Sequence, residues 1–411
     1  MNRSLKATLP VIAFLNFVCC HAQVTVHPGN SVQDAINKAA PHDRVLIKKG
    51  DYKEWGIEIR KPVNIVGEDY PVIDAGGQGE IMTVFADSVT IEGLAFRNTG
   101  VSFLKEHAAL RLNEVSNANI RNNRITNAFF GIYLQYSSKC TLSGNYIRGD
   151  VVDEARAGNA IHIWKGDSIN VLNNITASHR DGIYFEFVSN SVISGNESRD
   201  NIRYGLHFMF SNDDVYSENV FRNNGAGVAV MFSKRIRMTR NTFEDNRGGS
   251  SYGILLKEIS RGEMDHNVFR RNTIGIYAEG ATAIDIHHND FESNGKAIDI
   301  KGNSIDNKII FNNFYANTFE VYTNTRSNHN HYDHNYWSQY NAYDLDDDGI
   351  ADEAYRPVNL MALITNKVPG AYILLHSYVA RSLDLMERIF PQLIPETLID
   401  EHPRMTPVEH D

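Results

Sequence analysis

The sequence predicts an all-β chain folded as a right-handed, single-stranded parallel β-helix, with a short N-terminal capping helix and a C-terminal helical extension. Two internal repeats predict this fold. An asparagine recurs near the end of each unit in steps of 22 to 29 residues, and a strand headed by a small residue keeps phase with it. Units of this length with short strands leave no room for a helix in each coil. The asparagine column comprises Asn123, Asn145, Asn174, Asn196, Asn219, Asn241, Asn267, Asn289, Asn313 and Asn335.

The second repeat is a strand signal. Each unit carries a Gly or Ala followed by apolar residues one and three positions later, and a period of two directs these side chains to one face of a strand. We expect them to fill the interior, while residues two and four positions after the marker face outward. The markers are Gly131, Ala160, Gly182, Gly205, Gly227, Gly253, Gly275 and Ala297.

The asparagine column is expected to be part of the scaffold. Stacked coils place equivalent residues on neighbouring strands about 4.8 Å apart. An inward asparagine at a turn can then bond backbone groups and the asparagines of the coils above and below. We therefore expect a ladder that holds the turns and has no catalytic role.

Residues 1–22 are expected to form a signal peptide. Arg3 and Lys6 precede a short apolar stretch, and Ala22 offers a small residue at the cleavage site. The apolar stretch is too short to span a bilayer. Lipidation at Cys19 is the alternative. Cleavage after Ala22 leaves a single cysteine, so stability must come from packing and not from an intramolecular disulfide.

Four segments are expected after the signal peptide. In residues 23–56, Ser31 begins a short helix signal, and this segment should form the N-terminal cap and the first strand. Residues 57–340 should form the parallel β-helix. Residues 341–368 form an acidic, Asp-rich loop segment, and residues 369–411 a C-terminal amphipathic helix with a proline-containing tail.

The acidic segment resembles a calcium-binding loop of the EF-hand type. Oxygen ligands at alternating positions and a Gly at the sixth are the shared features. Tyr355 stands where a bidentate Glu is expected. Calcium or another hard cation, and a solvated acidic loop without an ion, therefore both stay open. The carboxylates concerned are Asp344, Asp346, Asp348 and Asp352.

The C-terminal segment contains an apolar-rich stretch from Ala371 to Phe390, followed by Pro391. Apolar residues at helical spacing predict one amphipathic helix. Charges within it make a membrane-spanning role unfavourable, and they are Arg381, Asp384 and Arg388. Two roles remain open, namely folding back as a cap and docking onto a membrane protein.

One outward column contains residues that suit a soft metal ion. Met209 and Met231 should be vertical neighbours, and His207 lies on the same face as Met209. Two thioethers and an imidazole suit Cu(I). His162 and Glu186 on adjacent coils are further candidates, and an adaptable hydrophobic docking patch is the alternative explanation of the methionines. A weaker candidate cluster for a transition metal consists of His329, His331 and His334.

Charge and motifs narrow the function classes. The net charge of −10 and the lack of a basic block argue against a nucleic-acid partner. The sequence has no P-loop, serine-hydrolase or zinc-protease motif. Solenoids of the pectin-lyase type often process polysaccharides, so a polysaccharide lyase, a C5-epimerase and a carbohydrate-binding surface stay open as alternatives. Residues that could serve such chemistry are His162, His179, Asp181, Tyr184, Glu186 and Arg203.

Specific stretches point to one known family. They are Arg203–Asp213 with Val230–Ser233, and Asn335–Tyr340 running into Asp344–Asp352 and Tyr355–Pro357. These stretches resemble the NosD family, the β-helical periplasmic accessory proteins for the maturation of nitrous oxide reductase. Ala342 and Ala351 depart from the family pattern, which favours Gly there, and they soften turns of the acidic loop without removing its carboxylates.

The resemblance implies a periplasmic protein that binds copper and hands it on for cluster assembly in nitrous oxide reductase. It also implies two further partners, a membrane ABC transporter and a copper chaperone lipoprotein. Carried onto this chain, it makes His207, Met209 and Met231 the leading ligands for transiently bound Cu(I). The apolar stretch that ends at Phe390 becomes a candidate anchor on the transporter.

Overall fold

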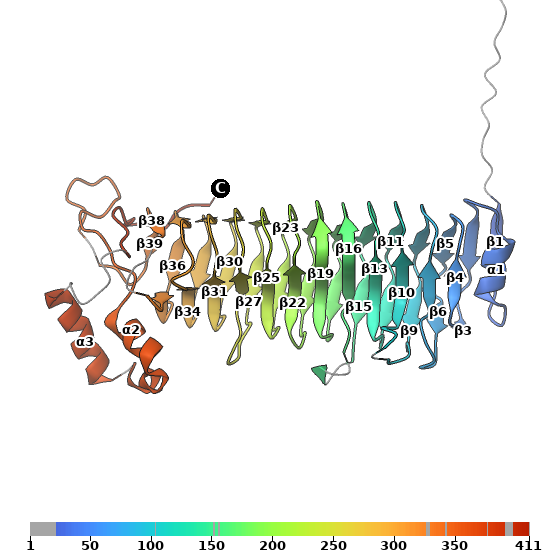
Figure 1. Ribbon diagram of the computed structural model, residues 1–411, viewed down its shortest axis with the longest axis horizontal. Coiled ribbons are helices and arrows are strands. Elements are labelled where there is room, and N and C mark those ends of the chain that lie inside the picture. The colour runs from blue at the N-terminus through green and yellow to red at the C-terminus, as the bar shows by residue number, and fades with distance from the viewer. Residues whose placement is uncertain are drawn as a thin grey trace, which may run out of the picture.

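Three strands recur in each coil of the solenoid, and each strand pairs in parallel with its equivalents in neighbouring coils (Figure 1). This arrangement confirms the predicted parallel β-helix. The expected signal peptide, apart from Ala22, lies outside the described residues. The computed structural model describes residues 22–102, 104–150, 153–154, 157–325, 329–341, 343–375, 377–390 and 398–410.

The strands form three long sheets, which wrap one shared core. The 14-stranded sheet contains β1 (Gln23–Val26), β2 (Arg44–Ile47), β5 (Asn64–Gly67), β8 (Thr90–Glu92), β11 (Asn119–Arg121), β14 (Thr141–Ser143), β17 (Asn170–Leu172), β20 (Val192–Ser194), β23 (Val215–Ser217), β26 (Arg237–Thr239), β29 (Glu263–Asp265), β32 (Asp285–His287), β35 (Lys308–Ile310) and β38 (His331–Asp333). The 13-stranded sheet contains β3 (Asp51–Lys53), β6 (Val72–Asp74), β9 (Ala95–Arg97), β12 (Arg124–Thr126), β15 (Tyr146–Arg148), β18 (Ile175–Ala177), β21 (Glu197–Arg199), β24 (Val220–Arg222), β27 (Thr242–Glu244), β30 (Val268–Arg270), β33 (Asp290–Glu292), β36 (Asn313–Tyr315) and β39 (Tyr336–Trp337). The 12-stranded sheet contains β4 (Ile57–Ile59), β7 (Met82–Val84), β10 (Ala108–Asn113), β13 (Phe130–Gln135), β16 (Ile161–Asp167), β19 (Asp181–Ser189), β22 (Tyr204–Met209), β25 (Ala226–Met231), β28 (Ile254–Lys257), β31 (Ile274–Glu279), β34 (Lys296–Ile300) and β37 (Phe319–Thr323).

Inward side chains stack from coil to coil because equivalent strands pair in register. The 13-stranded sheet illustrates this with a column of buried rings whose successive centroids lie 4.1–5.5 Å apart. Burying one such side chain contributes roughly 1.5–3 kcal/mol. The column therefore locks the register of the later coils. It consists of Phe221, Phe243, Phe269, Phe291, Phe314 and Trp337.

The expected asparagine ladder runs along the turn that follows the 14-stranded sheet. Each buried side-chain amide donates to the Oδ1 of the next asparagine at 2.9–3.1 Å, from Asn123 to Asn335. One expected member is wrong. Asn312, not Asn313, continues the ladder, because Asn312 follows the left-handed residue of the turn. Asn313 instead donates to the side chain of Asp290 and to the carbonyl of Val408.

A second asparagine ladder lies at the turn between the 13-stranded and 12-stranded sheets. Its side-chain amides donate to the next Oδ1 at 2.9–3.5 Å. The sequence prediction did not include it. Two opposed rows of buried, hydrogen-bonded amides thus hold the later coils in one register. The members of this second ladder are Asn201, Asn224, Asn246, Asn272, Asn294 and Asn317.

The N-terminal end of the core is capped by α1 (Val32–Lys38). The side chain of Ser31 accepts from the backbone of Asp34, which confirms the expected N-cap. The carboxylate of Glu54 accepts from the first backbone amides of the helix, including that of Val32 at 2.7 Å. The solenoid itself begins at β1, well before residue 57, because β1 already pairs in register with β2.

The C-terminal stretch does not form the single helix expected from Ala371 to Phe390. The structure instead has α2 (Leu360–Lys367), the 3₁₀ helix η2 (Pro369–Leu374) and α3 (Tyr378–Ile389). Pro369 lacks the amide that would continue α2, and Ser377 is the N-cap of α3. No described helix is long and apolar enough to cross a membrane.

The end of the solenoid is covered by α2, which precedes the stretch from Ala371 to Phe390, and the choice between cap and docking surface for that stretch stays open. α2 packs against β37 and buries Met361 and Ala362, so it serves as the cap. α3 contacts α2, and the backbone amide of Leu360 donates to the carboxylate of Glu387. α3 lies at the end of the molecule (Figure 1), and most of its apolar side chains stay exposed. They are Tyr378, Val379, Leu385, Met386 and Ile389.

The tail of residues 398–410 returns to the solenoid and terminates the first asparagine ladder. Buried Asp400 accepts from the backbone and side-chain amides of Asn335 at 3.1 and 3.0 Å. It also accepts from the indole N–H of Trp337 at 2.9 Å. The chain then runs back over earlier coils, where Val408 bonds the side chain of Asn313. The tail thus satisfies the donors that the last coil leaves open.

Replacing Asp400 by Ala should loosen the last coil. The change leaves the buried donors of Asn335 and Trp337 without an acceptor, at a cost of about 1–3 kcal/mol for each unsatisfied group. Hydrogen exchange in residues 331–337 should therefore accelerate at least tenfold. Glu401→Ala, an exposed neighbour, is the control. Equal exchange rates in the two variants would show that Asp400 does not terminate the ladder.

Candidate functional site

The two outward methionines of the predicted soft-metal column are cross-strand neighbours. β22 and β25 pair with Met209 opposite Met231, so the register confirms the expected stacking. Paired residues on adjacent strands lie about 4.8 Å apart, close enough for two thioethers to approach one ion. Both side chains are half-buried on the outer face of the 12-stranded sheet. They remain accessible to an incoming ion.

A strip of exposed phenylalanine rings runs beside the methionines. Phe187, Phe210 and Phe232 directly follow β-sheet positions Glu186, Met209 and Met231 in the sequence. Their rings stack at 5.2 and 5.1 Å, and each residue is 39–46% exposed. All three adopt the left-handed backbone conformation, which is unusual for bulky residues. The sheet face therefore combines thioethers with an apolar contact strip.

His207 lies on the same face as Met209, but it is buried and not surface-exposed as expected. Its ring packs against Tyr184 and Tyr204 at 5.0 and 4.8 Å. Among the described residues neither ring nitrogen has a hydrogen-bond partner. Burial, followed by the charges of Arg203 and Arg180, lowers the pKa of His207 to about 3. The imidazole is therefore neutral at physiological pH, which is the form that binds a metal.

The two further residues considered for this site behave differently. Glu186 pairs in register with Met209, and the hydroxyl of Tyr184 lies 3.8 Å from the Met209 sulfur. A carboxylate thus lies one strand below the thioether. His162 does not join, because Tyr184 stands between it and His207 in the register and its Nδ1 pairs with the amide of Asn159 at 2.9 Å.

Two of the six residues considered for polysaccharide chemistry are not accessible from solvent. His179 and Asp181 are completely buried, so a polymer cannot reach them. Burial raises the pKa of Asp181 to about 6, against the opposing charges of Arg203 and Arg180. Burial likewise lowers the pKa of His179 to about 4. These groups belong to the packed interior and its edge.

The acidic loop brings three of its four predicted carboxylates together. Ligand atoms of Asp344, Asp346 and Asp348 lie within 4.8 Å of one another. The fourth carboxylate, Asp352, is not part of this group and accepts a hydrogen bond from the backbone amide of Leu345 at 2.7 Å. Repulsion from Asp348 is the first cause that raises the pKa of Asp346. Cation binding by this loop stays a prediction.

Two further groups of histidines and carboxylates were not expected in this form. One contains Asp265, His287 and His288, and the other Asp333, His334 and His402. Of the expected cluster His329, His331 and His334, only His334 belongs to one of these two groups, the one with Asp333 and His402. The sequence contained a signal that could have predicted these groups. In three coils a histidine directly precedes the ladder asparagine, at positions 266, 288 and 334.

Comparisons with known proteins agree on one family. Residues 143–343 match the model of the family described as periplasmic copper-binding protein (NosD), and residues 55–176 match a right-handed β-helix model. A probable ABC transporter binding protein NosD of Pseudomonas aeruginosa is 30% identical over 399 residues, covering 90% of this chain and 92% of that protein. Its namesake in Stutzerimonas stutzeri is 29% identical over 383 residues, covering 88% and 87%.

Solved structures share the architecture. A family 28 exopolygalacturonase of Yersinia enterocolitica superposes with a TM-score of 0.60 at 11% identity, over 76% of this chain and 78% of that chain. The A-module of the Azotobacter vinelandii mannuronan C-5 epimerase AlgE6 gives a TM-score of 0.53 at 15% identity, over 74% and 88%. Likeness at such low identity shows the fold alone.

The imidazole of His207 should stay neutral from pH 8 down to pH 5. The pKa of His207 is lower in the folded chain than in the unfolded chain, so as the pH falls the unfolded chain takes up the proton at a higher pH. Acid therefore destabilises the fold once the pH drops below the ordinary histidine value of about 6.5. Nitrogen-15 NMR of the histidine rings measures this state. By contrast, the Asp333 carboxylate raises the pKa of His402, which should titrate above its usual range. A His207 midpoint near 6.5 would contradict the buried, unpaired environment.

Proposed function

The chain belongs to the NosD family, and on that premise we propose that it is a periplasmic accessory protein that accepts Cu(I) and passes it on for cluster assembly in nitrous oxide reductase. The family description supports copper binding in the periplasm. The names of the two relatives support an ABC transporter as partner. Copper is thus cargo and not a resident cofactor.

The observation that carries this proposal is the register pairing of Met209 with Met231. Thioether sulfur is a soft donor that favours Cu(I) over the harder divalent ions. Neither thioether needs to lose a proton, so their contribution to binding should depend weakly on pH. Two donors on a rigid sheet hold an ion without enclosing it, which suits release to another protein.

His207 is proposed as the nitrogen donor of the same site. It lies two positions before Met209 on one strand face, and its ring nitrogens have no partner within the described chain. Its burial keeps the ring neutral, so copper meets no competing proton. Tyr184 and Tyr204 pack against this ring, so the imidazole reaches an ion held by the thioethers only after these tyrosine rings move aside.

The phenylalanine strip is proposed as the docking surface for the copper-exchanging partner, such as a chaperone lipoprotein. Exposed, contiguous apolar side chains on a soluble protein mark interaction sites. Phe210 and Phe232 lie beside Met209 and Met231, so a partner seated there would meet the ion directly. This placement supports transfer between proteins without release of free copper.

The exposed face of α3 is proposed as the contact to the transporter. The exposed apolar side chains of α3 have no cover in the described structure, and the helix lies at the end of the solenoid away from the N-terminal cap (Figure 1). An amphipathic helix that fits a hydrophobic groove is a common mode of recognition. The copper-binding face and the membrane contact are thereby separated along one rigid body. The proposed role is one of binding, with no catalytic step.

Replacing both outward methionines by leucine should weaken Cu(I) binding. Met209→Leu/Met231→Leu keeps volume and apolarity but removes both sulfur donors, so affinity should fall at least tenfold while the fold is kept. Competition titration with a chromophoric Cu(I) chelator measures the affinity, and circular dichroism checks the fold.

The chain supplies a matched control for this variant. Met238 and Met264 form another register pair, but they lie inside the core of the 14-stranded sheet. Met238→Leu/Met264→Leu should leave the Cu(I) affinity unchanged. Unchanged Cu(I) affinity in Met209→Leu/Met231→Leu, or equal losses of affinity in both variants, would contradict the assignment of Met209 and Met231 as copper ligands.

Placing charge on the exposed face of α3 should weaken binding to the transporter. Met386→Glu/Ile389→Glu puts two carboxylates where an apolar surface would be buried, so co-purification with the transporter should be lost. Ser382→Glu, at an exposed polar position of the same helix, is the control. Cu(I) affinity should not change in either variant. Full co-purification of the double variant would exclude α3 as the contact.

A further inference from the structure

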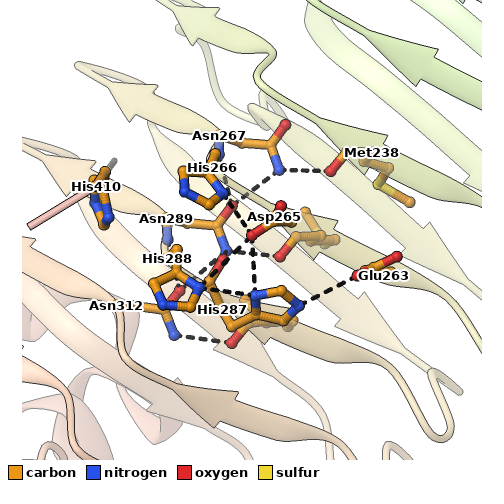
Figure 2. A network of polar contacts seen from close by, with 12 residues as sticks. Met238, Glu263, Asp265, His266, Asn267, His287, His288, Asn289, Asn312 and His410 are labelled. Carbon is orange, nitrogen blue, oxygen red and sulfur yellow. Dashed lines mark hydrogen bonds and ion pairs between the residues drawn. The ribbon is translucent and has the colours of Figure 1, made fainter. Parts of the chain in front are cut away.

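A cluster of imidazoles surrounds one carboxylate on the 14-stranded sheet (Figure 2). The Met209–Met231 pair lies on a different sheet, the 12-stranded one. Oδ1 of Asp265 lies 2.6 Å from Nδ1 of His266, 3.0 Å from Nδ1 of His287 and 3.7 Å from Nδ1 of His288. The Nδ1 atoms of His287 and His288 are themselves 3.0 Å apart. Three ligand atoms of metal-binding type thus converge on one point.

The solenoid register creates this convergence. β29 and β32 pair with Asp265 opposite His287. His266 and His288 occupy the left-handed position of successive turns, directly before the ladder residues Asn267 and Asn289. Those two asparagines are hydrogen-bonded at 2.9 Å, so the backbone under the cluster is fixed.

The distances match those required by a small divalent ion. A tetrahedral ion with bonds of about 2.0–2.1 Å holds its ligand atoms about 3.3–3.4 Å apart. The three separations among Asp265, His287 and His288 are 3.0, 3.0 and 3.7 Å. Only small movements of the rings would be needed. All three residues are half-buried, which leaves a path for the ion.

The other ring nitrogen of His287, Nε2, already faces a carboxylate. This Nε2 lies 3.5 Å from a carboxylate oxygen of Glu263, on the same strand as Asp265. A carboxylate on the far nitrogen of a metal-binding imidazole fixes the ring and makes its other nitrogen the ligand. This arrangement directs Nδ1 of His287 toward the ion.

The C-terminal tail closes one side of the cluster. His410 packs its ring against His266 and His288 at 5.5 and 6.0 Å, and its Nε2 lies 3.0 Å from Asp290. The same tail is bonded to Asn313 through Val408. The site is therefore flanked by groups that shield it without filling it.

We propose that Asp265, His287 and His288 form a binding site for a divalent transition-metal ion of the Zn²⁺ class, with water in the open position. One carboxylate and two imidazoles are borderline ligands, unlike the soft thioethers of Met209 and Met231. The chain thus carries a second metal site on a different sheet, with a different ion preference. Its existence does not depend on the proposed copper function.

Zn²⁺ binding by the metal-free mature protein tests this site. Competition with a chromophoric Zn²⁺ chelator at pH 7.5 gives the number and affinity of tight sites. His287→Asn/His288→Asn should lose one tight Zn²⁺, while Asn tolerates the left-handed position of residue 288. His334→Asn/His402→Asn, which disrupts the other Asp–His group, should retain that Zn²⁺.

A gentler variant guards against misfolding. Glu263→Gln keeps the shape but removes the charge behind His287, and it should weaken Zn²⁺ binding about 10-fold or more. Cu(I) affinity should be unchanged in all these variants, which separates failure of this site from failure of the methionine site. The same Zn²⁺ number and affinity in the wild type and in His287→Asn/His288→Asn would overturn the proposal, as would a wild type without tight Zn²⁺.

Discussion

Register between successive coils is the constraint on which the rest of this structure depends. It is held by buried asparagines whose amides bond both a backbone carbonyl and the next asparagine, as Asn174 does with Leu142 and Asn196. A one-residue slip would turn every inward side chain outward and leave these amides unsatisfied in the core. The ladder therefore fixes which residues meet across coils, and stacked rings inside the sheets reinforce that choice.

A solenoid with fixed register turns sequence spacing into surface geometry. Residues 22 apart, such as Met209 and Met231, become neighbours on a rigid face without any loop to position them. On another sheet the same rule places Asp265 opposite His287. One scaffold can in this way present a soft-donor pair and a nitrogen and oxygen cluster at separate places, each open to one side. Rigid, open presentation suits an ion that must be handed over.

The sequence was informative where interactions repeat and uninformative where they do not. The asparagine period predicted the coils and the ladder, and the strand markers Gly205 and Gly227 predicted the pairing of the two methionines. The choice between Asn312 and Asn313 failed, since adjacent asparagines both fit the period and only the turn conformation separates them. Burial of His207 was also missed, because an outward strand position says nothing about neighbouring rings that cover it. The tail could not be anticipated, since the contact of Asp400 with Asn335 joins residues 65 apart and follows no repeat.

Copper K-edge X-ray absorption on the Cu(I)-loaded protein examines the proposed handover site itself. The pairing of Met209 with Met231 and the unpartnered ring of His207 lead us to expect two sulfur neighbours and one nitrogen neighbour around the ion. The sulfur scattering should vanish in Met209→Leu/Met231→Leu. A copper shell of nitrogen and oxygen alone in the wild type would contradict a thioether site on this face and would place the cargo elsewhere on the solenoid.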